Sequence, residues 1–95
     1  MNSHQRLHAK VKGRVQGVGF RYYVLGAASE IGLVGWVRNR RDGSVEVIAE
    51  GKTEILGELV QALERGSRSS AVKEVKTQLQ EATGEFDTFF VRGTL

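Results

Sequence analysis

A glycine-rich segment between a strand-like and a helix-like stretch constrains the fold of this chain most. It reads Gly13-Arg14-Val15-Gln16-Gly17-Val18-Gly19-Phe20-Arg21. Glycine permits left-handed backbone conformations, and a loop with few side chains lets successive backbone N–H groups point toward one centre. The following helix adds its own unpaired N–H groups and the positive end of its dipole. The segment therefore predicts a strand-to-helix turn that can hold an anion, with Arg21 where the helix begins.

The residues alone leave more than one interpretation of this segment open. It can be a turn that needs glycine for its backbone, with Arg21 solvated on the first helical turn. It can also be an anion loop in which the guanidinium of Arg21 binds two oxygens of the ligand. The nucleotide-binding motifs fit poorly. A Walker loop needs Gly-Lys followed by Ser or Thr, and a Rossmann fingerprint needs a third glycine where Tyr22 stands.

Length and composition indicate one domain. The 95 residues suffice for a single core, with 40% hydrophobic and 26% charged residues, as in ordinary globular proteins. The chain has no cysteine, which excludes disulfides, a thiolate nucleophile and Cys-ligated metal sites. No apolar leader or membrane-length run occurs, so we expect a cytoplasmic protein with no membrane partner. We expect residues 1–95 to form the domain, with residues 1–5 as a disordered tail.

The net charge of +3 favours anionic partners, which include phosphorylated metabolites as well as nucleic acids. The densest basic cluster is Arg38, Arg40 and Arg41. This cluster could form a nucleic-acid patch, but three charges beside a hairpin turn are more often a solvated sheet edge, and we expect that role for them.

Hydrophobic periodicity predicts five strands and two helices. The strands are expected over residues 7–11, 33–39, 44–50, 72–79 and 86–92. The helices are expected over residues 20–31 and from a Thr53 cap to about Gly66. Asp42-Gly43 is a strong hairpin signal, so the second and third strands should be antiparallel neighbours. Gly26, inside the first helix, suggests close packing against the sheet.

The order β-α-β-β-α-β predicts an α+β fold of the ferredoxin-like, split βαβ type. In this arrangement an antiparallel sheet carries two helices on one face. The fold does not define the function, because it carries many unrelated activities.

Three motifs then point to a family. They are the segment 13–21, the segment Gly35-Trp36-Val37-Arg38-Asn39 and the segment Phe89-Phe90-Val91-Arg92. With them the chain closely resembles the acylphosphatases over nearly its whole length, and the first two motifs occur at the separation found in that family. The resemblance implies a hydrolase that splits the carboxyl–phosphate anhydride bond of acyl phosphates into a carboxylate and inorganic phosphate. It also implies that the reaction uses no metal and no other cofactor.

The same resemblance implies the site residues. Arg21 matches the family's phosphate-binding arginine, and Asn39 matches the asparagine that orients the attacking water, so both are expected to be catalytic. Some family members have a cysteine at the position of Gly19, a difference that leaves the catalytic groups unchanged. The residues that match the family's phosphate-binding loop are Arg14, Val15, Gln16, Gly17, Val18, Gly19, Phe20 and Arg21.

The expected partners are a small acyl phosphate, with inorganic phosphate or another anion in the loop, and the expected protein is a monomer. His4 and His8 lack the spacing of a metal site, so no metal is expected. The alternative function is a non-catalytic phosphate- or RNA-binding module of the same fold. Nucleic acid is disfavoured, because residues 45–50 offer carboxylates and no aromatic platform where an RNA-recognition sheet carries aromatic residues.

Overall fold

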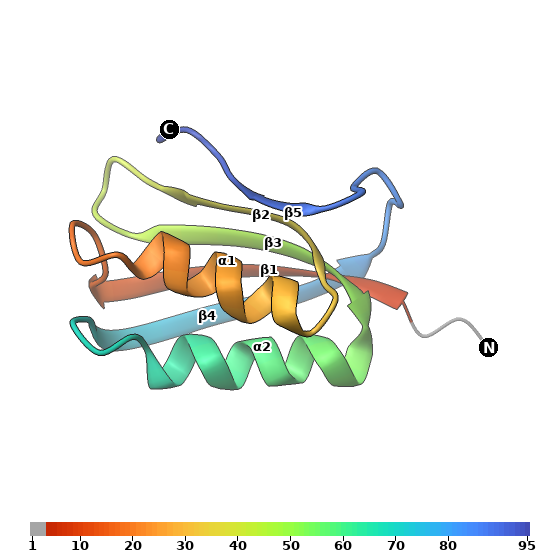
Figure 1. Cartoon of the computed structure of the whole chain (residues 1–95), viewed down its shortest axis with the longest axis horizontal. Coiled ribbons are helices and arrows are strands. Elements are labelled where there is room, and N and C mark those ends of the chain that lie inside the picture. Colours follow the sequence, from red (N-terminus) through yellow and green to blue (C-terminus); the bar gives the residue numbers. More distant parts are fainter. Residues whose placement is uncertain (1–3) are drawn as a thin grey trace.

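The computed structural model describes residues 4–95. The described elements form one sheet of five strands with two helices packed on one face (Figure 1). This confirms the predicted α+β class and the order β-α-β-β-α-β, which a short fifth strand follows. In chain order the elements are β1 (His4–Arg14), α1 (Phe20–Glu30), β2 (Val34–Asn39), β3 (Val45–Lys52), α2 (Thr53–Arg65), β4 (Ala71–Glu81) and β5 (Phe89–Val91).

The strand order across the sheet is β4-β1-β3-β2-β5. β1 runs antiparallel to both β3 and β4, and β2 runs antiparallel to β3. The pair β2 and β5 is parallel, so the expectation of a wholly antiparallel sheet is wrong for this pair. β4 ends opposite Gln5, at the end of the sheet where β2 begins. Because residues 82–88 connect to β5 from that end, β5 starts beside the start of β2 and runs in its direction.

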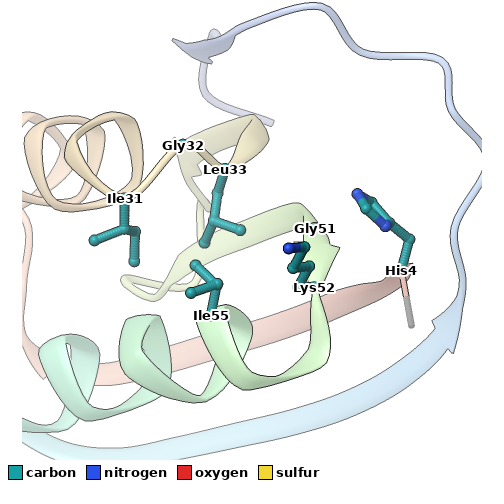
Figure 2. Close-up of a pocket in the computed structure, with 7 residues that line it drawn as sticks. All are labelled: His4, Ile31, Gly32, Leu33, Gly51, Lys52 and Ile55. Carbon is teal, nitrogen blue, oxygen red and sulfur yellow. The ribbon is translucent and has the colours of Figure 1, made fainter. Parts of the chain in front are cut away.

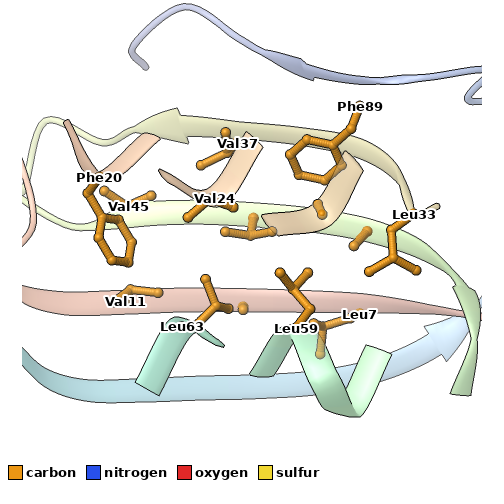
Figure 3. Close-up of a cluster of buried hydrophobic side chains, with 14 of the residues drawn as sticks. Leu7, Val11, Phe20, Val24, Leu33, Val37, Val45, Leu59, Leu63 and Phe89 are labelled. Atoms are coloured by element: carbon orange, nitrogen blue, oxygen red, sulfur yellow. The ribbon is translucent and has the colours of Figure 1, made fainter. Parts of the chain in front are cut away.

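The register of β1 and β3 builds the sheet side of the core. Leu7, Ala9 and Val11 pair with Ala49, Val47 and Val45, respectively, and all six side chains are at most 1% exposed. Since alternate residues of a strand share a face, these pairs form one apolar surface beneath the helices (Figure 3). The helices complete the core with Phe20, Val24 and Ala28 from α1 and Leu56, Leu59, Ala62 and Leu63 from α2. Full burial of such a leucine or phenylalanine stabilises the fold by about 1.5–3 kcal/mol.

The helices differ from their predicted details at two residues. Thr53 is the first helical residue of α2 rather than its cap, and Lys52 occupies the cap position. The Thr53 hydroxyl donates a hydrogen bond to Oε1 of Gln5 at 2.7 Å. Gly26 is exposed, and an added Cβ there would meet nothing within 4 Å. The expectation that Gly26 packs closely against the sheet is therefore wrong.

The N-terminal boundary also differs from the expected tail over residues 1–5. His4 and Gln5 belong to β1 and pair with Lys52 and Gly51 of β3. The antiparallel ladder continues to these residues because β3 extends to Lys52. Residues 1–3 lie outside the described residues. Over residues 4–95, neither helix is long and apolar enough to cross a membrane.

Candidate active site

The glycine-rich loop and the residue Asn39 lie at the same end of the sheet. The loop, residues 15–19, connects the end of β1 to α1, and Asn39 is the last residue of β2. Val45, the first residue of β3, pairs with Val11 near the end of β1 on one side and with Asn39 on the other. The β2–β3 hairpin turn, residues 40–44, therefore lies at the same end of the sheet as the loop (Figure 1).

The loop backbone requires glycine at two positions. Gly17 and Gly19 have φ angles of 72° and 75°, in the left-handed region that side chains with a Cβ disfavour. An added Cβ would meet nothing within 4 Å at either position. The backbone conformation, and not a lack of space, therefore explains why these positions hold glycine.

The donors of the loop are its backbone N–H groups. Throughout the described chain, no N–H from Gln16 to Gly19 donates a hydrogen bond to another backbone group. Gly19 caps α1 without a side-chain hydrogen bond, and the first turn of this helix has no acidic side chain. The loop and the helix start thus offer several backbone donors and a positive dipole end to an anion.

Three apolar residues anchor the loop to the core. The side chains of Val15 and Phe20 are each 1% exposed and belong to the core. Val18 is half-buried and packs against the same core. These three residues can therefore reach an anion only through their backbone, while their side chains hold the two ends and the middle of the loop in place.

Gln16 connects the loop to the β2–β3 hairpin. Its Nε2 donates hydrogen bonds to the carbonyl oxygens of Arg40, at 2.7 Å, and of Ser44, at 2.8 Å. A side-chain amide nitrogen carries two hydrogens, so these bonds use both. Arg40 and Ser44 are also joined by a backbone hydrogen bond of 2.8 Å. The amide of Gln16 therefore fixes the loop against the hairpin that follows Asn39.

Asp42 stabilises the turn to which Gln16 binds. Its Oδ1 accepts hydrogen bonds from the Ser44 backbone N–H, at 2.9 Å, and from the Ser44 hydroxyl, at 2.6 Å. Its Oδ2 lies 2.8 Å from Nζ of Lys10. The hydrogen bond from Lys10 and those from Ser44 hold the pKa of Asp42 well below its usual range, so the turn contains an ionised carboxylate at neutral pH.

Glu46 of β3 fixes the two arginines that flank Asn39. Its Oε1 accepts hydrogen bonds from Nε of Arg38, at 2.8 Å, and from Nη1 of Arg40, at 3.3 Å, while its Oε2 lies 2.7 Å from Nε2 of His8. Burial raises the pKa of Glu46, but the hydrogen bonds with His8 and Arg38 outweigh it and lower that pKa. The side chain of Arg38 is only 11% exposed. The expectation of a solvated basic edge is therefore wrong for Arg38.

Asn39 presents an unpaired acceptor. Its backbone carbonyl accepts a hydrogen bond from the N–H of Leu95 at 3.2 Å. Its side-chain Oδ1 is buried and has no hydrogen-bond partner in the described part of the chain. Alternation along β2 places Asn39 on the same sheet face as buried Val37. A buried acceptor without a partner costs free energy, so its presence marks a position where a ligand or water can donate to it.

The two arginines of the loop motif lie at its ends. Arg21 is half-buried in the first turn of α1, and among residues 4–95 its guanidinium makes no hydrogen bond or ion pair. Arg14 is exposed at the end of β1, where it pairs with Ala71 of β4. The guanidinium of Arg21 thus has all five of its N–H donors available to an anion.

The histidines lie elsewhere. His8 contacts Glu46, and His4 lies at the end of β1 opposite the loop. No three His, Asp or Glu side chains of the described residues gather so that they could hold a metal ion.

A separate hollow of about 300 Å³ lies beside His4 (Figure 2). Ile31, Leu33 and Ile55 form its apolar wall, and Lys52 also lines it. None of its lining residues belongs to the loop or the hairpin. This hollow is therefore separate from the candidate active site.

The fold and the loop define a small ferredoxin-like domain with a glycine-rich turn between β1 and α1. The family model for acylphosphatases matches residues 7–91. An acylphosphatase of Moorella thermoacetica is 49% identical over 90 residues, which cover 95% of this chain and 96% of that protein. An acylphosphatase of Bacillus licheniformis is 52% identical over 79 residues, which cover 83% of this chain and 84% of that protein.

The crystal structure of acylphosphatase from Bacillus subtilis has a TM-score of 0.89 to this chain at 39% identity, and the match covers 93% of this chain and 98% of that one. This chain therefore belongs to the acylphosphatase family. The resemblance seen in its sequence motifs is confirmed.

Proposed function

We propose that this protein hydrolyses acyl phosphates at the loop of residues 15–19, with Arg21 and Asn39 as its catalytic side chains. The observation that carries the proposal is the position of the unpaired Oδ1 of Asn39 on a hairpin that Gln16 ties to a loop of unpaired backbone donors. The three similar proteins described above are named acylphosphatases, and this supports the same reaction. We further propose that the protein acts as a monomer in the cytoplasm.

The chemistry of an acyl phosphate suits this set of groups. In the reaction RCO–OPO₃²⁻ + H₂O → RCOO⁻ + H₂PO₄⁻, the oxygen of water forms a bond to phosphorus while the bridging P–O bond breaks. The leaving group is a resonance-stabilised carboxylate, so it needs no strong general acid. The remaining tasks are to balance charge on the phosphoryl oxygens and to hold the water in line with the breaking bond.

Arg21 and the backbone donors of the loop perform the first task. A guanidinium binds two phosphoryl oxygens with two parallel hydrogen bonds. The N–H groups of the loop and of the first turn of α1 bind the remaining equatorial oxygen. These bonds accelerate the reaction to the extent that they strengthen as charge redistributes in the transition state.

Asn39 performs the second task. Its Oδ1 accepts a hydrogen bond from the attacking water and so directs a lone pair of that water at phosphorus. An amide oxygen is too weak a base to remove the proton, so the proton passes to the phosphate as the bond forms. The role of Asn39 is therefore orientation of the nucleophile, without a change in its own charge.

A kinetic comparison of two variants tests the assignment. Protein treated with EDTA should hydrolyse benzoyl phosphate at the rate of untreated protein. Asn39→Ala should reduce kcat by about 10²–10³-fold while inorganic phosphate still inhibits with nearly the wild-type constant. Arg21→Ala should weaken phosphate inhibition as well as turnover.

Two results would contradict the proposal: loss of activity in EDTA, or wild-type kcat/KM in both variants. A protein that binds RNA in a salt-sensitive manner and hydrolyses no acyl phosphate would instead support the binding-module alternative.

A further inference from the structure

Tyr22 is the most exposed large hydrophobic residue of the described chain. Its exposed fraction is 66%, compared with 57% for Leu95, 49% for Leu79 and 39% for Phe90. The adjacent aromatic residues are occupied in packing. Phe20 is 1% exposed, and the hydroxyl of Tyr23 donates a hydrogen bond to the carbonyl of Ala62 in α2 at 2.8 Å. Packing within the chain therefore does not explain an aromatic side chain at position 22.

The helix places Tyr22 on its outer side, directly after Arg21. The core-facing residues of α1 include Phe20 and Val24. At about 100° per residue, Tyr22 lies about 200° around the helix axis from each of them, and so faces away from the sheet. Side chains of a helix lean toward its N-terminus, so Tyr22 covers the surface over the start of α1, where the loop ends.

In the proposed reaction, the direction from which water attacks phosphorus decides where the acyl group lies, and it favours the outer side of α1. Asn39 ends β2, so in the proposed function its Oδ1 binds the water on the side of the phosphoryl group that faces the sheet. In an in-line displacement the leaving oxygen lies opposite the nucleophile. The acyl group, which the leaving oxygen carries, then points away from the sheet and toward the outer surface of the first turn of α1.

We propose that Tyr22 contacts the acyl group and makes the site selective for acyl phosphates with an aromatic or bulky apolar acyl group over acetyl phosphate. This inference rests on the proposed function. The phenol ring presents a flat apolar surface on which an aromatic or branched acyl group can pack, whereas an acetyl group is too small to cover it. Tyr22 is a specificity residue in this assignment, and the phosphate is still bound by the loop and Arg21.

The test compares two substrates in three variants. For wild-type protein, kcat/KM should be higher for benzoyl phosphate than for acetyl phosphate. Tyr22→Ala should lower this ratio by about threefold to tenfold, mainly through a higher KM for benzoyl phosphate. Tyr22→Phe should keep the wild-type ratio, because it keeps the ring. Inhibition by inorganic phosphate should be the same in all of these proteins.

Phe90→Ala provides the matched control, since it also removes an exposed aromatic ring. Phe90 pairs with Trp36, on the sheet face opposite the helices, and its variant should keep the wild-type ratio. An unchanged ratio in an active Tyr22→Ala protein, or an equal loss in Phe90→Ala, would overturn the inference while leaving the proposed function intact. Wild-type protein that hydrolyses neither substrate would overturn both.

Discussion

At the scale of single residues, Gln16 joins the two parts of the proposed site. In the proposed site the loop supplies the phosphate donors and the hairpin follows Asn39, and these segments are distant in sequence. The two hydrogen bonds of the Gln16 amide, to the carbonyls of Arg40 and Ser44, set the distance between them. Catalysis by orientation depends steeply on such distances. We therefore propose Gln16 as a positioning residue, because its side chain contacts the hairpin that follows Asn39.

Replacement of Gln16 by alanine should affect both stability and turnover. Gln16→Ala leaves two partly buried carbonyls with fewer donors, so the free energy of unfolding should fall by about 1–2 kcal/mol. kcat should fall by about tenfold, because Asn39 and the loop lose their fixed separation. Gln16→Glu is the matched control of similar size. Its ionised carboxylate donates no hydrogen bond and places a negative charge against the carbonyl oxygens of Arg40 and Ser44, so it should be less active than Gln16→Ala.

These effects are measurable by urea unfolding and by steady-state kinetics with benzoyl phosphate. A Gln16→Ala protein with wild-type kcat and stability would show that the hydrogen bonds of Gln16 to the hairpin have no role in positioning.

The role of Gln16 could not be predicted from the sequence. The motif placed Gln16 in the loop, but its acceptors are backbone carbonyls 24 and 28 residues away, and every residue type has such a carbonyl. The unpaired state of Asn39 Oδ1 is a property of burial, and a single polar residue before a turn gives no signal of it. By contrast, Gly17 and Gly19 were predictable as loop residues, because a left-handed backbone selects the residue type itself.

At the scale of elements, each helix has an interior glycine without a packing role. Gly26 in α1 and Gly57 in α2 are exposed, and an added Cβ would meet nothing within 4 Å at either position. Gly26→Ala and Gly57→Ala should each raise the free energy of unfolding by about 0.5–1 kcal/mol, because alanine loses less backbone entropy in a helix.

The two effects should add in the double variant, since the residues lie on different helices. Chemical denaturation measures the free energy of unfolding of the single and double variants. Hydrolysis of benzoyl phosphate is the control that shows whether the site is intact. A decrease in stability in either variant would contradict the account of helix packing.

The connection between β4 and β5 is held by a buried carboxylate, Glu50 of β3. The side chain of Glu50 is 4% exposed and accepts hydrogen bonds from the backbone N–H groups of Thr83, at 2.9 Å, and Gly84, at 3.0 Å. It also pairs with Nε of Arg6 at 2.7 Å. Burial raises the pKa of Glu50, but the hydrogen bonds from Thr83 and Gly84 and from Arg6 outweigh it and lower the pKa to about 2.

This carboxylate predicts a loss of stability in acid. Its folded-state pKa lies below the ordinary value of 4.5, so its ionised form stabilises the folded state above that value. The stabilisation is lost as the pH falls from there toward about 2. Glu50→Gln should be less stable than wild type at neutral pH by on the order of 1–3 kcal/mol, and the difference should shrink as the pH falls through this range. Urea unfolding of wild type and Glu50→Gln at several pH values measures the difference in stability and its pH dependence. A difference that does not change with pH would contradict the stabilising role of the Glu50 carboxylate.

The elements were predictable to different degrees for a physical reason. Alternation from Leu7 to Val11 and the Asp42-Gly43 turn are local signals, and both predicted the observed strands and hairpin. The β5 strand has only three residues, and its direction depends on how residues 82–88 cross the end of the sheet. Thr53 likewise has the residue type of a cap, but its hydroxyl bonds to Gln5 of β1. The direction of β5 and the role of Thr53 thus depend on residues that are distant in sequence.

At the scale of the whole molecule, the described residues divide into a core and two distinct ends. The core between the sheet and the helices holds the loop through Val15 and Phe20. The loop and the hairpin occupy one end of the sheet, and the hollow beside His4 occupies the other (Figures 1 and 2). The central claim is that an anion binds at the first end, through backbone N–H groups. A measurement that reports on every backbone amide at once therefore discriminates between the two ends.

That measurement is a titration of ¹⁵N-labelled protein with inorganic phosphate, followed by the ¹H–¹⁵N spectrum of every backbone amide. Because an anion draws the amide proton into a hydrogen bond, the largest downfield shifts should come from residues 15–21, in saturable fashion. Sodium chloride at equal ionic strength should leave these signals unchanged. Largest shifts around the His4 hollow or on the open sheet face, with residues 15–21 unaffected, would contradict the account.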